Sequence, residues 1–261
     1  MVLRGLKSLI SKAPGKLVRA RAYTGYRAIG ASGKPHGPNL RGVARRLGET
    51  VFSAGELSIA PSSRFKGKTW SGPDGGIRRG KAVDAQVSRL AKASAAARAG
   101  GGGPKKKKRL LRLTSHFFAA LQHHGLEPFE AQRVVLDLRR GIATAVDVVC
   151  QRGADELVLV ELKTGYRGNR AAPVLLRGAA AHMQRPLQTA VDCALHRHLA
   201  QLAATHALFC MEDGTAQALK RLGIERVSGA LLYVDDDATE LHELSEWWMR
   251  RGQRLLDVTA R

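Results

Sequence analysis

Two apolar, β-branched segments lie on either side of a short polar break in the second half of the chain. They read IATAVDVVC (142–150) and ELVLVELK (156–163), and the break between them is QRGAD. Such a pattern is typical of an antiparallel hairpin. A turn centred on Ala154 places Asp147 opposite Glu161. Because residues two apart on a strand share a face, Lys163 is expected on the same side as these two carboxylates.

Apolar residues at regular spacing predict the rest of the architecture. The alternate hairpin residues expected to face a core on the opposite side are Val146, Val148, Val160 and Leu162. The elements expected around the hairpin are a helix over 80–90, a helix over 113–124, a strand over 130–139, a long helix over 179–203, a small helix over 214–222, a strand over 227–234 and a last helix over 241–256. Asp237 and Glu240 have the spacing of a capping box before that last helix.

The paired carboxylates indicate a cation-binding site. Two carboxylates that face each other in an apolar strand pair repel, and removing them from water is costly unless a cation lies between them. Lys163 and a divalent metal are the two candidates for this cation. Carboxylate oxygens with room for water suit Mg²⁺ or Mn²⁺, which can activate water and neutralise the charge of a phosphodiester. The alternative is an edge hairpin with an ordinary solvated face.

Residues 145–165 closely resemble the active-site hairpin of the PD-(D/E)xK nuclease superfamily. Its members typically carry Asp on one strand and Glu-x-Lys on the next, as Asp147 and Glu161–Lys163 stand here. Val146 replaces the proline that gives the family its name. The resemblance extends over about the last 150 residues. It implies an αβββαβ core, with a mixed central sheet between helices. It also implies that Asp147, Glu161 and the carbonyl of Leu162 bind Mg²⁺, and that Lys163 positions the attacking water.

RecB-like members of this superfamily add polar side chains from two helices. A helix after the Glu-x-Lys strand often carries a Q-x-x-x-Y motif, for which Gln188 is the best match although Asp192 stands in place of the tyrosine. Gln184 lies one helical turn before Gln188 and is expected to look toward the hairpin with it. An upstream helix often contributes a further group, for which Asp84 and Gln86 are candidates beside an ordinary polar helix face.

Positive charge is concentrated in the first part of the chain. Of 43 Lys and Arg, 26 precede residue 114, together with only four of the 22 acidic residues, whereas the formal net charge of the whole chain is +21. This asymmetry indicates a polyanionic partner, with sequence-nonspecific DNA as the leading candidate. An anionic membrane is the alternative, but no apolar run approaches the roughly 18 residues of a spanning helix, so we expect no membrane partner.

The chain divides into three segments, and the first two carry this positive charge. Residues 1–48 contain no acid and fit either a partly disordered basic arm or a mitochondrial or plastid presequence. Residues 49–112 form a basic, Gly- and Ser-rich region with one helix and, over 91–103, a flexible linker. That region ends in a basic run that resembles a nuclear localisation signal bound by an import receptor, or else a phosphate-binding patch. The run comprises Pro104, Lys105, Lys106, Lys107, Lys108 and Arg109.

The third segment, 113–261, is expected to be the nuclease core. The loop after the Glu-x-Lys strand carries Arg167 and Arg170, which we expect to contact phosphates. The leading hypothesis is a Mg²⁺-dependent deoxyribonuclease, an exonuclease of DNA repair, recombination or genome processing in the nucleus or in a virus-infected eukaryotic cell. The alternatives are a DNA-binding protein on a nuclease-like scaffold without chemistry and a structural DNA-compacting protein.

Overall fold

The central hairpin is present, in the register expected from a turn at Ala154. The computed structural model describes residues 16–19, 26–29, 35–53, 75–98, 109–165 and 170–260. Strands β5 (Ile142–Arg152) and β6 (Glu156–Thr164) are antiparallel, and they pair Val148 with Val160 and Arg152 with Glu156. The predicted register is therefore confirmed for the part of the hairpin that is paired.

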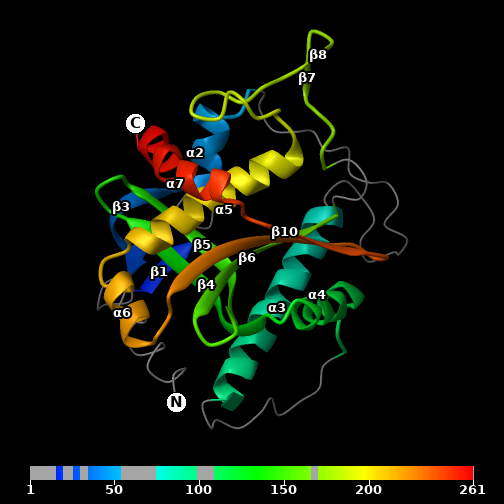
Figure 1. Cartoon of the computed structure of the whole chain (residues 1–261), viewed down its shortest axis with the longest axis vertical. Helices are drawn as coiled ribbons and strands as arrows, with labels where there is room; N and C mark the ends of the chain where they lie inside the picture. Colours follow the sequence, from blue (N-terminus) through cyan, green and yellow to red (C-terminus); the bar gives the residue numbers. More distant parts are fainter. Residues whose placement is uncertain are drawn as a thin grey trace.

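The hairpin lies in the middle of a mixed eight-stranded sheet (Figure 1). Beyond β6, the sheet continues with β9 (Arg226–Val234), which is parallel to β6, and with β10 (Thr239–Glu243), which is antiparallel to β9. On the other edge of β5 lies β4 (Glu127–Asp137), which is antiparallel to it. The first residues of β5 also pair with β3 (Pro35–Gly42) in parallel, and β2 (Tyr26–Ile29) and β1 (Lys16–Arg19) follow outward.

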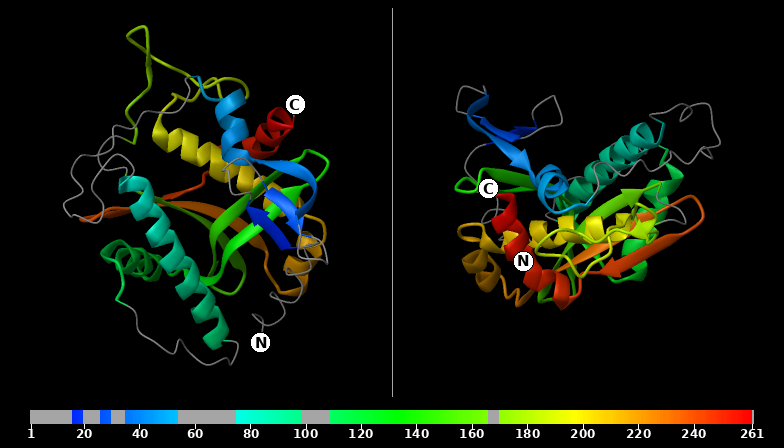
Figure 2. Two further views of the ribbon diagram at one scale, coloured as in Figure 1. Left: turned by 180° about the vertical axis from the view of Figure 1, so that it is seen from behind. Right: turned by 90° about the horizontal axis from the view of Figure 1, so that it is seen from above.

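Helices cover both faces of this sheet, so the chain has an α/β fold with a mixed sheet between helices (Figure 2). One face carries α2 (Val43–Thr50), α5 (Ala194–Met211), α6 (Thr215–Arg221) and α7 (Glu246–Thr259), and we call the apolar cluster beneath them the larger core. The other face carries α3 (Gly75–Arg98) and α4 (Arg112–His123) over a smaller core. The alternation of β6 explains this division, because Leu157 and Leu159 enter the larger core while Val158 and Val160 enter the smaller one.

Segments before residue 113 help to build both cores. Val43, Leu47 and Val51 are fully buried in the larger core, and Val83 and Val87 are fully buried in the smaller one. The acid-free segment 1–48 and the Gly- and Ser-rich region 49–112 thus both contribute packed helices. Helix α3 also continues through Arg98, so residues 91–98 of the expected linker are helical and 99–103 lie outside the described residues.

Two predicted helices begin later than expected. Residues 179–193 are mostly irregular, and the helix begins only at Ala194 and extends to Met211. Pro186 has no amide hydrogen to donate within a helix, and Met183, Leu187 and Ala190 reach the larger core from a non-helical path. The apolar spacing of this segment therefore reflects burial and not helical periodicity.

The second error concerns the segment after β9. Strand β10 occupies part of the helix expected over 241–256, and Leu241 pairs with Leu232 across the β9–β10 hairpin. Asp237 and Glu240 therefore cap no helix. Helix α7 begins later, at Glu246, after Ser245.

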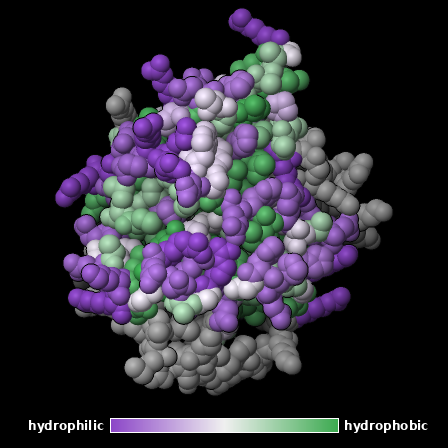
Figure 3. All heavy atoms as spheres, in the orientation of Figure 1, coloured by the Kyte–Doolittle hydropathy of each residue, from purple (hydrophilic) through white to green (hydrophobic). Residues whose placement is uncertain are grey.

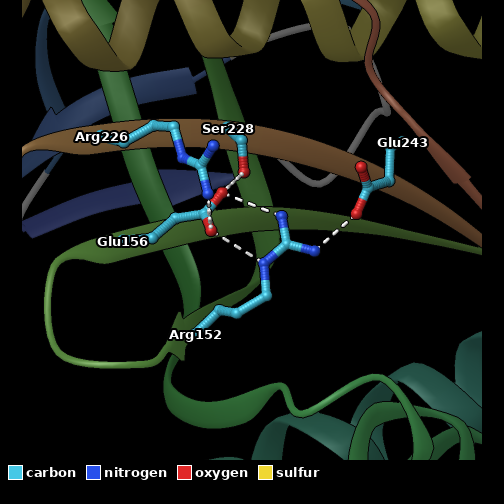
Figure 4. A network of polar contacts seen from close by, with 5 residues as sticks. All are labelled: Arg152, Glu156, Arg226, Ser228 and Glu243. Carbon is cyan, nitrogen blue, oxygen red and sulfur yellow. Dashed lines mark hydrogen bonds and ion pairs between the residues drawn. The ribbon is translucent and has the colours of Figure 1, made fainter.

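A charged network holds the turn end of the central hairpin (Figure 4). The buried carboxylate of Glu156 accepts hydrogen bonds from Arg152 Nε at 2.8 Å, Arg226 at 2.7 Å and Ser228 Oγ at 2.5 Å. Arg152 also contacts Glu243 on β10 at 2.5 Å. These contacts join the four strands β5, β6, β9 and β10 at the turn end of the hairpin.

Candidate active site at the open end of the hairpin

Strands β5 and β6 stop pairing just before the three predicted site residues. The last backbone pair is Val148 with Val160, and Asp147 then bonds through its side chain, since its Oδ2 accepts the amide hydrogen of Leu162 at 2.9 Å. The carboxylate thus takes the place of a backbone acceptor. This replacement directs the side chain of Asp147 into the gap between the strands.

Strand β5 also changes face at Asp147. Val148 packs in the smaller core as expected, but Val146 packs in the larger core, so the prediction that both share one face is wrong. The irregularity is matched on β4, where Gln132 has a φ of 55°. Gln132 Nε2 donates to Asp147 Oδ1 at 3.3 Å and to Asp84 Oδ1 on α3 at 2.9 Å. Two neighbouring strands are therefore distorted around one carboxylate.

Glu161 and Lys163 face helix α5. Lys163 Nζ lies 2.6 Å from Glu161 Oε1, and Gln201 Nε2 on α5 donates to the same oxygen at 2.8 Å. Lys163 Nζ also lies 3.4 Å from Gln201 Oε1. The side chains of Glu161 and Lys163 are 5% and 17% exposed, so this arrangement is largely shielded from water.

The electrostatics of the site are unbalanced toward negative charge. Burial raises the pKa of Asp147 well above its usual value, and the charges of Glu161 and Asp84 add to the increase. Lys163 and the amide of Leu162 oppose it. A raised carboxylate pKa means that the folded protein destabilises the charged form of Asp147. A cation next to Asp147 and Glu161 would relieve this cost.

A histidine and a tyrosine lie behind Lys163. Tyr233 is the register partner of Lys163 on β9, and Tyr233 Oη lies 2.8 Å from His198 Nδ1 on α5. Burial lowers the pKa of His198 well below 6.5, and the positive charges of Lys163 and Arg197 lower it further. His198 is therefore neutral near pH 7, so it does not place a second positive charge beside Lys163. Sequence analysis did not assign His198 or Tyr233 to the site.

Asp235 contacts Gly165 and Arg170, the two described residues on either side of 166–169. The amide of Gly165 donates to Asp235 Oδ1 at 3.1 Å, and Arg170 lies 3.4 Å from Asp235 Oδ2. Arg170 also pairs with Glu240 and stacks over the ring of Tyr233. Its guanidinium thus already faces two carboxylates, and its expected contact with phosphate remains a prediction. Arg167 lies outside the described residues.

Helix α3 contributes one of its two candidate residues to the site. Asp84 reaches it through Gln132, as described above. Gln86 instead accepts the amide hydrogen of Leu111 at 2.9 Å and so anchors the segment before α4. The helix approaches β6 closely, because a Cβ atom on Gly80 would lie 3.2 Å from Thr164 Oγ1. A glycine at this position allows the contact.

The glutamine at the site is Gln201 and not the predicted Gln188. Gln188 and Gln184 have exposed side chains in the irregular segment before α5, whereas Gln201 bonds to Glu161 and Lys163. The misplaced helix caused this error. Once α5 is known to begin at Ala194, Gln201 is a polar side chain on a helix otherwise rich in buried Ala and Leu, and this pattern is the signal that could have identified it.

The donor groups fit a hard divalent cation with few protein ligands. Asp147 and Glu161 supply carboxylate oxygens and Leu162 supplies a carbonyl, and Mg²⁺ commonly takes one or two carboxylates and completes its shell with water and phosphate. Within the described part of the chain, no group of three or more His, Cys, Asp or Glu is arranged to hold a metal ion. A divalent cation held by these residues would therefore need water or substrate oxygens to complete its coordination shell.

The basic run lies mostly beyond what the structure describes. Lys105, Lys106, Lys107 and Lys108 are outside the described residues, while Arg109 is exposed and its carbonyl lies 3.4 Å from Gln86 Nε2. Among the helices that are described, none is long and apolar enough to cross a membrane. No protein-family model matches the chain, and no curated protein matches it.

Proposed function

We propose that the protein is a metal-dependent DNA nuclease of the PD-(D/E)xK type. The observation that carries this proposal is the meeting of Asp147, Glu161 and Lys163 at the open end of the β5–β6 hairpin, where Gln201 contacts Glu161 and Lys163. The chain order α4, β4, β5, β6, α5, β9 agrees with the αβββαβ order of that superfamily. Its restriction-endonuclease-like core is part of the proposal.

Asp147, Glu161 and the carbonyl of Leu162 would hold Mg²⁺ or Mn²⁺. When bound, such an ion lowers the pKa of water and neutralises charge on a phosphodiester. The raised pKa of Asp147 supports this assignment, because the chain places more negative charge around that carboxylate than Lys163 offsets. The strand opening at Asp147 supports it too, since the carboxylate is directed into the gap.

Lys163 would act on the attacking water and the phosphate, and Gln201 would position this lysine. An ammonium group in a shielded site stabilises a developing negative charge more strongly than it does in water. Gln201 orients Lys163 and Glu161 together because its amide contacts both. The neutral His198 behind them adds no second positive charge beside Lys163.

The basic segments before residue 113 would supply the grip on DNA. Their charge favours binding to the phosphate backbone regardless of base sequence, with an affinity that falls as salt rises. The nuclear, mitochondrial or plastid location of the protein stays a prediction, as does its place in repair, recombination or genome processing.

Cleavage of matched linear and covalently closed circular DNA tests the proposal. The full chain is incubated with each DNA in Mg²⁺ and in EDTA, beside Lys163→Ala and the exposed-lysine control Lys220→Ala. We expect Mg²⁺-dependent cleavage that falls at least about 100-fold in Lys163→Ala and is unchanged in Lys220→Ala. DNA binding in EDTA and the thermal melting of Lys163→Ala should stay close to wild type. Loss of the linear form alone indicates an exonuclease, and cutting of the circle indicates an endonuclease.

A non-catalytic DNA-binding protein is the second candidate. It is favoured by the ion pair between Lys163 and Glu161, since the pair satisfies part of the site without a metal. This candidate takes the lead if the wild type and Lys163→Ala are equally inert on every DNA. Full cleavage by Lys163→Ala in a clean preparation would instead overturn the catalytic role given to Lys163.

A further inference from the structure

The segment between β6 and α5 projects from the fold as a short hairpin. Strand β7 (Leu175–Leu176) pairs with β8 (Ala179–Ala180), and Arg177 and Gly178 form the two-residue turn with φ values of 52° and 82°. Positive φ at both turn residues suits the twist of a tight hairpin. We call residues 173–182 the finger, and Figure 1 shows it extending beyond the helices and the sheet.

The base of the finger is firmly attached to the body. Pro173 pairs with Cys193 and His182 with Val191, and the amide of Val174 donates to the carbonyl of Asp192 at 2.8 Å. The side chain of Asp192 is fully buried, where it accepts hydrogen bonds from Arg197 Nε at 2.5 Å and, with its other oxygen, from Ser53 Oγ at 2.6 Å. The finger is thus an ordered projection that begins next to α5 and α2.

The tip of the finger exposes apolar side chains. Leu175 is 63% exposed and Leu176 is 47% exposed, and the two alanines across the hairpin are exposed as well. Figure 3 shows hydrophobic atoms along this protrusion and hydrophilic atoms at its outermost point. Single apolar side chains are common on protein surfaces, but an apolar pair at the end of a projecting, anchored hairpin marks a contact site.

The charge around the finger identifies the class of partner. Residues 166–191 contain no Asp or Glu, and Arg177 at the turn and Arg185 are exposed, whereas Arg170 is paired with Asp235 and Glu240. The segment also follows directly after the strand that carries Glu161 and Lys163. A partner that combines negative charge with flat apolar faces is a nucleic acid, whose phosphates attract arginine and whose bases stack against apolar side chains.

We propose that the finger is a wedge for the ends of duplex DNA. Leu175 and Leu176 would stack against the terminal base pair and unstack it, while Arg177 contacts a backbone phosphate. Apolar wedges of this kind insert between base steps in other DNA-binding proteins. One separated strand would then run toward Asp147 and Glu161. The inference rests on the proposed nuclease function for the fate of that strand, but not for the unstacking itself.

A base analogue whose fluorescence rises on unstacking tests the wedge without any cleavage. Duplex DNA carries 2-aminopurine at its end or at an internal position, and it is mixed with Lys163→Ala protein in EDTA. We expect an increase of about threefold at the end and none inside. Adding Leu175→Ser and Leu176→Ser should abolish the increase, while the affinity for DNA changes less than about threefold. Leu138→Ser is the matched control, because Leu138 is 59% exposed in the turn after β4.

Cleavage rates separate this inference from the proposed function. If the wild type cuts DNA, the double serine variant should lose at least about tenfold on blunt duplex ends and keep its rate on single strands. If the wild type cuts nothing, the nuclease proposal fails, but the fluorescence result still decides the wedge. Equal fluorescence with and without the leucines overturns it. The inference is also overturned if the two serine substitutions abolish binding to anionic lipid vesicles, or abolish a dimer, but do not change the 2-aminopurine fluorescence.

Discussion

Gln201 supports the site by contacting both Glu161 and Lys163. Its amide nitrogen donates to Glu161 Oε1 at 2.8 Å while its amide oxygen faces Lys163 Nζ at 3.4 Å. One side chain thus orients two groups of opposite charge, and its location on α5 couples their placement to the packing of the larger core.

Replacing Gln201 with alanine is expected to slow cleavage by about 10- to 100-fold, because Lys163 and Glu161 lose their common partner. The fall should appear in kcat more than in KM, since Gln201 positions catalytic groups and is not assigned a contact with DNA. Gln188→Ala serves as the control and should cleave like wild type, as its side chain is exposed outside α5. Steady-state kinetics on one substrate measure both. A loss in Gln188→Ala that equals the loss in Gln201→Ala would restore the original assignment.

The difference between these glutamines shows what the sequence could predict at this scale. Glu161 and Lys163 could be placed because they lie two apart on one strand, and the hairpin register brought Asp147 next to them. The change of face in β5 at Asp147 could not be predicted. Gln201 could not, because its location depends on where α5 begins, and the spacing of Leu187, Val191 and Leu195 suggested too early a start. The burial of Met183, Leu187 and Ala190 from an irregular path produced a similar spacing without a helix.

At the scale of elements, the hairpin is held at one end and open at the other. Glu156 ties β5, β6 and β9 together at the turn, while Asp147 interrupts the pairing of β5 with β6 at the far end. The two ends therefore differ in their response to acid, because the pKa of Glu156 is lowered whereas the pKa of Asp147 is raised.

Acid should weaken the turn end in a defined pH range. The hydrogen bonds from Arg152 lower the pKa of Glu156 from 4.5 to about 2, with Ser228 and Arg226 adding to this effect and burial opposing it. Because the folded protein prefers the charged form, the stabilisation is fully present above pH 4.5 and is lost as the pH falls through about 2.

Urea unfolding of Glu156→Gln measures this contribution. We expect a loss of about 2 kcal/mol in the free energy of unfolding at pH 7, after allowing for solvent around Arg226, and a loss that shrinks toward pH 2. Glu243→Gln is the control, since the side chain of Glu243 is 61% exposed, and it should lose less than about 0.5 kcal/mol. A loss in Glu156→Gln that is independent of pH would contradict the charge-based explanation.

At the scale of the whole molecule, the fold reaches further toward the N-terminus than charge and composition indicated. Val43 and Leu47 close the larger core and Val83 and Val87 close the smaller one. Leu40, which precedes them in the chain, is buried as well. A count of Lys and Arg identifies a basic segment, but it does not reveal that a few valines and leucines within that segment are buried.

Truncation from the N-terminus tests how much of the basic segment belongs to the folded core. A fragment that starts at residue 113 is expected to lack a cooperative thermal transition, because both faces of the sheet lose helices that bury apolar surface. A chain that starts at residue 35 should keep the transition, since it retains β3, α2 and α3 with the core residues Val43, Leu47 and Val83. Differential scanning calorimetry of the two proteins beside the full chain makes the comparison. Cooperative unfolding of the shorter fragment would show that α2 and α3 are dispensable additions.

The burial of α2 also restricts how the chain can mature in a cell. An N-terminal import signal for a mitochondrion or plastid is discarded after delivery, and the acid-free first 48 residues have the composition of such a signal. A peptidase that removed all of them would take away Leu40, Val43 and Leu47 and leave the larger core open. If this signal is used, its cleavage point must therefore lie upstream of Leu40, and the released peptide is shorter than the charge pattern alone would mark out.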